Sequence, residues 1–270
     1  MNCVIYRFTL REPSSLNNKE LGSFSSFAKG RSFCPHCKHT LSWPDLIPVF
    51  SFLFLGGKCR YCSKRISWQY PAVEISTALI FLLISNFQFS IFNKFSIFNF
   101  QTILYLVYLF ITSSLLIVIF VYDLKHYIIP DSIIFSAIGL VFLFWILDFG
   151  ICNLFGIWCF EFEILNPLIS GLVAAGLFLF IILVSRGKWM GMGDVKLAFF
   201  MGLFLGFPQI IVALFLAFLI GAIIGTGLVL AKKRVLKSEV PFGPFLVTGT
   251  FIAFFWGEEI IQWYLNLFNF

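Results

Sequence analysis

Residues 102–122 read TILYLVYLFITSSLLIVIFVY and contain no charged side chain. An α-helix rises about 1.5 Å per residue, so a stretch of this length reaches across the roughly 30 Å hydrocarbon core of a bilayer. The residue that follows is Asp123, a carboxylate at the very end of the apolar stretch. The sequence therefore predicts a membrane-spanning helix that ends in an acid.

Comparable apolar stretches recur through the rest of the chain. Of the 270 residues, 60% are hydrophobic and only 12% are charged, which is far from the mixture found in soluble domains. We expect about seven spans, of which the fifth is short: residues 71–90, 102–122, 132–149, 165–185, 194–207, 209–231 and 242–266. The predicted fold class is therefore an all-α polytopic membrane protein, with residues 71–270 forming the helical bundle.

The polar N-terminal segment, residues 1–70, is expected to be a small separate domain on the cytoplasmic side. Lysine and arginine are enriched in cytoplasmic segments next to membrane spans. This segment carries ten of them: Arg7, Arg11, Lys19, Lys29, Arg31, Lys38, Lys58, Arg60, Lys64 and Arg65. Counting the spans from there puts the other basic loops on the same side, whereas the opposite loops hold mostly acids. This topology accounts for the net charge of +6 without a nucleic-acid partner. The start of the chain lacks the pattern of a cleavable signal peptide.

Four of the seven cysteines form two CxxC pairs within residues 1–70: Cys34, Cys37, Cys59 and Cys62. Twenty-one residues separate the pairs, and two such knuckles can complete a tetrahedral site of four thiolates, which suits zinc. We expect a closed structural zinc site, with redox or incidental cysteine pairs as the alternative. His36 and His39 could replace a ligand, but four thiols suffice. Cys152 and Cys159 fall in a predicted outside loop, where a disulfide is an open alternative.

Four acids lie at the ends of the predicted spans: Glu74, Asp123, Asp131 and Asp194. Ionisable groups near the membrane core are costly and often functional. Ordinary helix-start roles can account for Glu74 and Asp131, which follow prolines, and they remain an alternative for Asp194. Asp123 differs, because a carboxylate is unfavourable at the negative C-terminal end of a helix. A solvated turn around Lys125 is the alternative for this residue.

Asp123 and Asp194 are predicted to lie at the same cytoplasmic face, on different helices. If the bundle brings them together, both carboxylates cannot ionise easily, so one stays protonated while the other can activate water. This is the chemistry of an aspartyl protease, and such a pair titrates as a unit. Gly191 and Gly193 would let a peptide backbone approach Asp194, although a flexible interhelical turn also explains them.

Several motifs, in the same order along nearly the whole chain, resemble the bacterial type 4 prepilin peptidases, which are membrane aspartyl proteases of the GxGD type. GMGDVKLA at 191–198 is similar to the GxGD segment of that family, and DLKHYIIPD at 123–131 to its first aspartate motif. The CxxC region from residue 34 to residue 74 resembles the family's cytoplasmic zinc domain. VPFGPFL at 240–246 resembles a signature that opens the last span.

The resemblance implies that Asp123 and Asp194 are the catalytic pair and that the four CxxC cysteines bind zinc. Members of the family cleave the short basic leader of prepilins and pseudopilins, after a glycine, at the cytoplasmic face of the bacterial inner membrane. Those with the cysteine domain usually also methylate the new N-terminus with S-adenosylmethionine; no residue here marks a site for that methyl donor.

The family has eight spans, and seven are expected here. NCVIYRFTLREPSS at 2–15 resembles the segment that directly follows the family's first helix. We therefore expect either that the true start lies upstream or that this is a truncated member, which leaves an inactive chain as one alternative.

Two other functions stay open on the residues alone. In a transporter the acids would bind cations or protons, but both key acids are predicted at one face and no mid-membrane acid or broken helix is apparent. A non-catalytic zinc-ribbon membrane adaptor would use the cysteines and leave the acids without a role. Replacing each aspartate by asparagine distinguishes the three functions.

Overall fold

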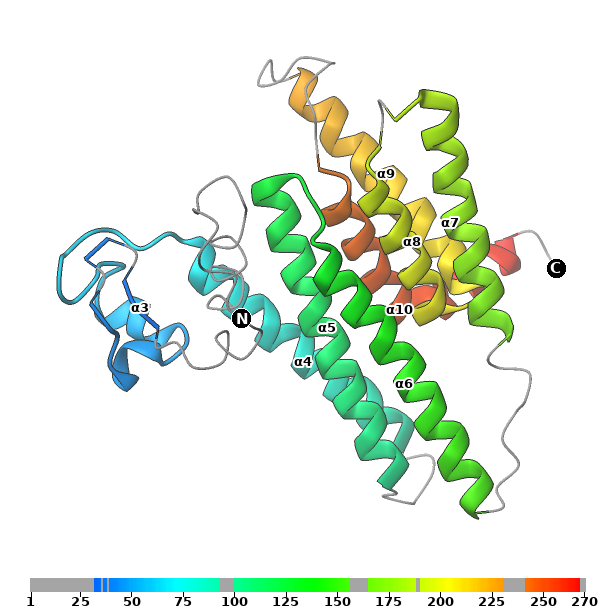
Figure 1. Cartoon of the computed structure of the whole chain (residues 1–270), viewed down its shortest axis with the longest axis horizontal. Coiled ribbons are helices and arrows are strands. Elements are labelled where there is room, and N and C mark those ends of the chain that lie inside the picture. The colour runs from blue at the N-terminus through cyan, green and yellow to red at the C-terminus, as the bar shows by residue number, and fades with distance from the viewer. Residues whose placement is uncertain are drawn as a thin grey trace, which may run out of the picture. The chain divides into compact units, whose positions relative to one another are not determined.

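The protein is described by a computed structural model that covers residues 32–34, 36–37, 39–92, 100–155, 165–187, 190–230 and 241–267. Only the backbone is described for residues 88–92, 100–101, 148–155 and 229. Within these residues the regular elements are helices, and β-structure is limited to two isolated bridges (Figure 1). The chain divides into two units, residues 1–83 and 84–270.

Seven of the described helices occupy the predicted spans: α4 (Gln69–Phe92), α5 (Phe100–His126), α6 (Asp131–Phe155), α7 (Leu165–Ser185), α8 (Met192–Leu205), α9 (Gln209–Leu230) and α10 (Gly243–Leu267). Of these, α4, α5, α7, α9 and α10 are long and apolar enough to cross a membrane. α8 has 14 residues, which gives a length of about 21 Å, less than the thickness of the hydrocarbon core. The prediction of an all-α membrane bundle with a short fifth helix is confirmed.

The short helix α8 lies inside the second unit, where it contacts α6, α7, α9 and α10. The side chains of Leu197 and Ala198 on α8 are fully buried. α7 packs against it backbone to backbone, because a Cβ on Gly202 of α8 would collide with the backbone of Gly171 on α7. Small residues at such crossings allow membrane helices to approach closely. Close packing on several sides thus fixes the position of α8 in the bundle.

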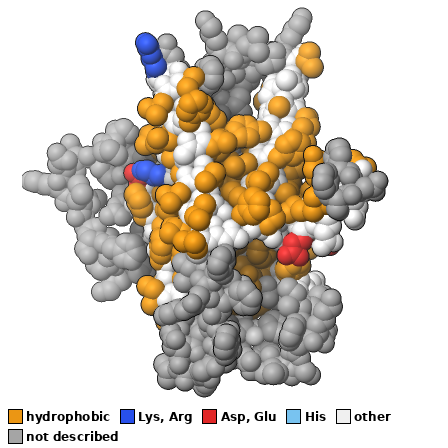
Figure 2. All heavy atoms as spheres, turned by 90° about the vertical axis from the view of Figure 1, so that its right-hand side faces the viewer, with side chains coloured by type: hydrophobic (Ala, Val, Ile, Leu, Met, Phe, Trp, Pro, Cys, Tyr) orange, Lys and Arg blue, Asp and Glu red, His pale blue; other side chains and the backbone are white. Residues whose placement is uncertain are grey.

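The outward faces of the bundle carry large apolar side chains. Hydrophobic side chains cover most of the described surface on the face shown in Figure 2. On α7 the side chains of Leu172, Val173, Phe180 and Leu183 are between 58% and 67% exposed. In water such a surface would drive association, whereas facing lipid it stabilises a spanning helix. Burial and composition therefore agree on a membrane protein.

The first unit contains a 3₁₀ helix, η1 (Trp43–Leu46), a short helix α3 (Phe50–Phe54) and the start of α4. The backbone amide of Val49, just before α3, donates a hydrogen bond of 2.9 Å to Oε2 of Glu74 on α4. Glu74 therefore joins the small helix to the second turn of α4, which is a structural role.

Candidate active site and metal centre

The structure brings Asp123 and Asp194 together. Asp123 lies in the last turn of α5 and is 4% exposed, and Asp194 is the third residue of α8. The negative charge of Asp123 acts directly on the carboxylate of Asp194. Two helix ends that are far apart in the sequence thus place their carboxylates as neighbours. The sequence predicted the two acids at the same face and left their pairing as a condition on how the helices pack.

Asp194 also takes part in the start of its own helix. Its Oδ2 accepts a hydrogen bond of 3.4 Å from the amide of Gly191, and its amide donates to the carbonyl of Gly191 at 3.2 Å. This reciprocal pair of bonds is a capping arrangement. Asp194 therefore combines the two roles that the sequence left open, because it caps α8 while it lies next to Asp123.

Asp123 has a buried carboxylate oxygen that lies against the start of α10. Among the described residues, its buried Oδ2 makes no hydrogen bond of good geometry, although the backbone of Gly243 lies close enough to interact with the carboxylate. An unsatisfied buried oxygen costs free energy, and such costs are tolerated where a site must receive a ligand. The start of α10 covers this oxygen, since a Cβ placed on Gly243 would lie 2.5 Å from Oδ2. Only glycine fits at position 243 without displacing the carboxylate.

The loop between α5 and α6 is clamped onto the start of α8. Lys196 on α8 donates to Oδ1 of Asp131, the first residue of α6, at 2.6 Å, and its ammonium group also lies 5.2 Å from the centre of the Phe135 ring. A Cβ on Gly193 would lie 3.0 Å from Cβ of Ile129 in the same loop. These contacts fix the end of α5 against the start of α8, and so they fix the separation of the two acids.

Gly243 and Lys196 were not assigned roles by the sequence. Both residues lie inside sequence motifs. Their roles, however, depend on contacts with other helices, which the sequence does not reveal. Asp131, for which capping was the ordinary interpretation, is found to pair with Lys196 across two helices.

The two CxxC pairs lie on two turns of the same construction. Each turn is closed by an isolated bridge, Phe33 with Thr40 in one and Lys58 with Arg65 in the other. In both turns the amide of the first cysteine donates to the carbonyl of the residue five positions later, at 2.9 Å. Each turn therefore presents its two thiols on the same side, as a metal-binding knuckle does.

The four thiols converge on one point. The sulfur atoms of Cys34, Cys37, Cys59 and Cys62 all lie within 4.8 Å of one another, and those of Cys34 and Cys62 are 3.9 Å apart. A tetrahedral zinc site with Zn–S bonds of about 2.3 Å places its sulfurs about 3.8 Å apart. The cluster thus fits a metal of this kind and leaves no position for water. His39 stacks on the ring of Tyr61, outside the cluster.

The four thiols of the cluster perturb one another in opposite directions. A hydrogen bond from the backbone of Lys64 stabilises the thiolate of Cys62, but burial and hydrogen bonds with the other thiols raise its pKa to about 11. Burial opposes the charged thiolate of Cys34, but hydrogen bonds to the backbone of Cys37 and His36 and to neighbouring thiols lower its pKa to about 7. A thiolate is the form that binds metal. Nearby, Asp45 ties η1 to the second knuckle through an ion pair of 3.0 Å with Arg60. Burial opposes the charge of Asp45, yet hydrogen bonds from Ser42 and the Arg60 charge hold its pKa below the usual range.

Two predicted features lie outside what the structure describes. The side chain of Cys152 and the whole of Cys159 are not described, so the question of a disulfide between them stays open. The basic residues of the predicted loop after α9 are also not described, so their position on the cytoplasmic side stays a prediction.

Two family models match the chain. The bacterial peptidase A24 N-terminal domain matches residues 1–87, and the type IV leader peptidase family matches residues 110–226. The first match contains both CxxC pairs, and the second contains Asp123 and Asp194.

Whole-chain relatives agree with these matches. A protein of Bacillus subtilis (strain 168) is 32% identical over 243 residues, which cover 88% of this chain and 86% of the relative. A protein of Aeromonas hydrophila is 32% identical over 245 residues, covering 88% and 76%. One of Pseudomonas aeruginosa is 29% identical over 241 residues, with the same coverage. All three carry the name prepilin leader peptidase/N-methyltransferase.

No solved structure matches the chain. The motifs, the paired acids, the cysteine knuckles and relatives covering most of both chains all lead to one assignment. The chain belongs to the type IV leader peptidase family.

Proposed function

We propose that this protein is a membrane aspartyl endopeptidase that removes the basic leader peptide of type 4 prepilins or pseudopilins, with Asp123 and Asp194 as its catalytic pair. One observation carries the proposal: the carboxylates at the end of α5 and the start of α8 lie close enough for their charges to interact, and that of Asp123 is buried. The names of the relatives support the substrate class.

Hydrolysis by this pair needs one ionised and one protonated carboxylate. The ionised acid takes a proton from a water molecule, whose oxygen attacks the carbonyl carbon of the scissile peptide. The protonated acid donates a hydrogen bond to the carbonyl oxygen, where negative charge develops. The tetrahedral intermediate collapses with cleavage of the C–N bond, and a proton passes from the acid pair to the leaving amine. The water thus ends in the new carboxyl and amino termini.

The remaining parts of the proposal follow the division of the chain into residues 1–70 and residues 71–270. The first part carries the zinc site on the cytoplasmic side of the bacterial inner membrane, and the second carries the protease site at the same face. The four thiols of Cys34, Cys37, Cys59 and Cys62 would hold the zinc ion. When bound, zinc would cross-link the two knuckles and contribute to the folding of this part of the chain.

Methylation of the new N-terminus is the second proposed activity. Its support is the N-methyltransferase part of the relatives' names and the presence of the cysteine domain. S-adenosylmethionine is the proposed methyl donor, and none of the described residues is assigned to its binding.

The proposal is tested with membranes that contain the chain and a prepilin-like substrate with a basic leader. We expect the leader to be removed, and mass spectrometry of the product to show one added methyl group when S-adenosylmethionine is supplied. Asp123→Asn and Asp194→Asn should each abolish leader removal. Glu258→Gln is the matched control, because Glu258 is an exposed acid in the second half of α10, away from the end that contacts Asp123. Cleavage that persists in either aspartate variant would reject the acid pair, and a silent parent chain would favour the adaptor function.

A further inference from the structure

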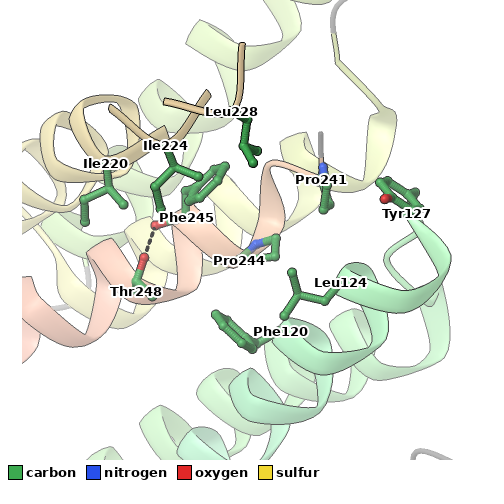
Figure 3. A pocket seen from close by; sticks show the side chains of 10 residues that line it. All are labelled: Phe120, Leu124, Tyr127, Ile220, Ile224, Leu228, Pro241, Pro244, Phe245 and Thr248. Atoms are coloured by element: carbon green, nitrogen blue, oxygen red, sulfur yellow. Dashed lines mark hydrogen bonds between the residues drawn. The ribbon is translucent and has the colours of Figure 1, made fainter. Parts of the chain in front are cut away.

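An apolar cavity of about 420 Å³ lies between α5, α9 and the start of α10 (Figure 3). Figure 3 shows side chains from all three helices around it, among them Phe120, Ile224 and Phe245. The described residues that line it do not include Asp123 or Asp194, and they do not indicate what fills the cavity. A second apolar surface, on the first unit, is better defined, because its contacts with α4 indicate which partner it meets.

This second surface is the outward face of helix α3. Phe50, Leu53 and Phe54 lie on one side of the helix, because a spacing of three and four residues brings side chains to the same face. Their side chains are 61%, 64% and 87% exposed. Phe52 lies on the opposite side, where it is buried and its ring centre is 5.0 Å from that of Trp68. Phe52 therefore anchors α3 in the unit, while three large apolar side chains face outward.

Two exposed tryptophans flank this face. Trp43 lies on η1, which contacts α3, and its side chain is 78% exposed. Trp68, which packs against Phe52, directly precedes α4 and is 76% exposed. An exposed patch of large apolar side chains marks contact with a protein partner or with a membrane. Tryptophan is the side chain that is enriched where a membrane meets water.

The attachment of α3 to α4 distinguishes a membrane from a protein partner. The amide of Val49, just before α3, donates to Oε2 of Glu74 in the second turn of α4. α4 is long and apolar enough to cross a membrane. Its exposed apolar stripe begins at the next residue, Ile75, and continues through Leu79 and Leu82. The hydrogen bond thus holds α3 beside the point where the lipid-facing stripe of α4 begins.

The charge of the first unit also suits a membrane surface. The second knuckle exposes Lys58, Lys64 and Arg65. Lys58 and Arg65 are bridge partners, so their side chains project from the same face of the turn. The side chain of Asp45, in contrast, is buried and paired with Arg60. The exposed charge of the knuckle is therefore positive, and anionic headgroups at the cytoplasmic face of a membrane attract such side chains.

We propose that the outward face of α3, together with Trp43 and Trp68, binds the surface of the lipid bilayer next to the start of α4. Apolar side chains of interfacial helices enter the boundary between headgroups and acyl chains to a depth of about 5–10 Å. The two cysteine knuckles would then be held against the cytoplasmic surface of the membrane instead of standing free in the cytoplasm. The inference rests on α4 as a membrane span and not on cleavage by the acid pair.

The first test is fluorescence quenching on the full chain in vesicles of phosphatidylethanolamine and phosphatidylglycerol. A genetically encoded fluorescent amino acid replaces Phe54, which leaves the cysteines unchanged, and nitroxide-labelled lipids carry the quencher near the headgroup end of the acyl chain. Quenching at position 54 should be close to that at Ile75 and about threefold or more stronger than at Thr40, an exposed residue of the first knuckle. Quenching at position 54 that is no stronger than at position 40 would overturn the proposal.

A matched pair of substitutions tests whether apolar character holds this face at the membrane. With the fluorescent residue at position 50, Phe54→Glu should lower quenching by about twofold or more, because a charged group is costly in the apolar layer. Phe54→Leu should leave quenching near the parental level. The yield of monodisperse protein in detergent shows that both variants fold, and Leu53→Glu replaces Phe54→Glu if that variant does not. Equal quenching in the charged and the apolar variant would count against the proposal.

Cross-linking identifies the occupant of the surface directly. A photoreactive phenylalanine derivative at position 54 should capture lipid in the same vesicles, which mass spectrometry of the chain detects. Capture of residues 1–31, of a second copy of the chain or of a prepilin-like substrate, without lipid, would overturn the proposal and identify the occupant instead. Leader removal is measured on the same samples, so loss of lipid contact with intact cleavage counts against the membrane surface of α3 alone.

Discussion

At the scale of single residues, the site depends on positions where no side chain fits. A Cβ on Gly243 would lie 2.5 Å from Oδ2 of Asp123 and 3.1 Å from its Cγ. Real Cβ atoms do not approach oxygen so closely, so alanine at this position must push the carboxylate or the start of α10 aside. The glycine thus sets how closely α10 can approach the acid.

Gly243→Ala is expected to lower the rate of leader cleavage by about 100-fold, because displacement of a catalytic group by about 1 Å has effects of this size. The amount of folded protein in the membrane should stay near that of the parent. Gly225→Ala on α9 is the control, since a Cβ there meets nothing within 4 Å. A Gly243→Ala variant with parental cleavage would show that Asp123 does not need this contact.

At the scale of elements, the clamp between α6 and α8 holds the two acid-bearing helix ends together. The Lys196–Asp131 ion pair has a length of 2.6 Å, and its side chains are 29% and 62% exposed. Exposed ion pairs of this kind add little to stability. Its expected role is therefore to position Asp194, and both partners are positioning residues.

Lys196→Met and Asp131→Asn should each lower kcat by about tenfold to 100-fold with little change in KM, because substrate contacts stay intact while the acids shift. The exchange variant Asp131→Lys with Lys196→Asp should recover part of the lost rate. Thermal unfolding of all variants in detergent should stay close to that of the parent. Absence of any recovery, together with a large loss of stability, would assign the pair a purely structural role.

The cysteine cluster leads to a separate prediction about metal binding in the first unit. The purified chain should contain about one zinc ion, since four converging thiols form one closed site. Cys34→Ser should remove the zinc, because Cys34 is a buried member of the cluster. Elemental analysis by mass spectrometry measures this, with Cys3→Ser as the control. Zinc retained in Cys34→Ser, or a disulfide within either pair in the parent, would favour the redox alternative.

At the scale of the whole molecule, the charge pattern and the helix order define one topology. Arg186, after α7, and the N-terminal domain are predicted on the cytoplasmic side, and the end of α10 on the opposite side. A reporter enzyme that is active only outside the cytoplasm should therefore be inactive when fused after residue 187 and active when fused after residue 267. The reverse pattern would place the acid pair on the wrong face for a basic cytoplasmic leader.

Much of this architecture could be predicted because apolar stretches long enough to span a bilayer have few alternatives. The position of Asp123 and Asp194 at the same face followed from counting spans, and the cysteine knuckles followed from their spacing, whereas the closeness of the two acids depends on how the helices pack. The roles of Gly243 and Lys196 could not be predicted, because each depends on which helices touch. The burial of α8 among four helices also follows only from packing, since a mostly apolar helix in a membrane can face either lipid or other helices.

The most direct test of the account is a single-turnover cleavage measurement on the parent chain, Asp123→Asn, Asp194→Asn and the double variant. If the acids act as one unit, each single variant should lose about a thousandfold or more, and the double variant should be no slower than the slower single variant. Retention of at least about a tenth of the parental rate in either single variant, or losses that multiply in the double variant, would contradict a shared catalytic pair.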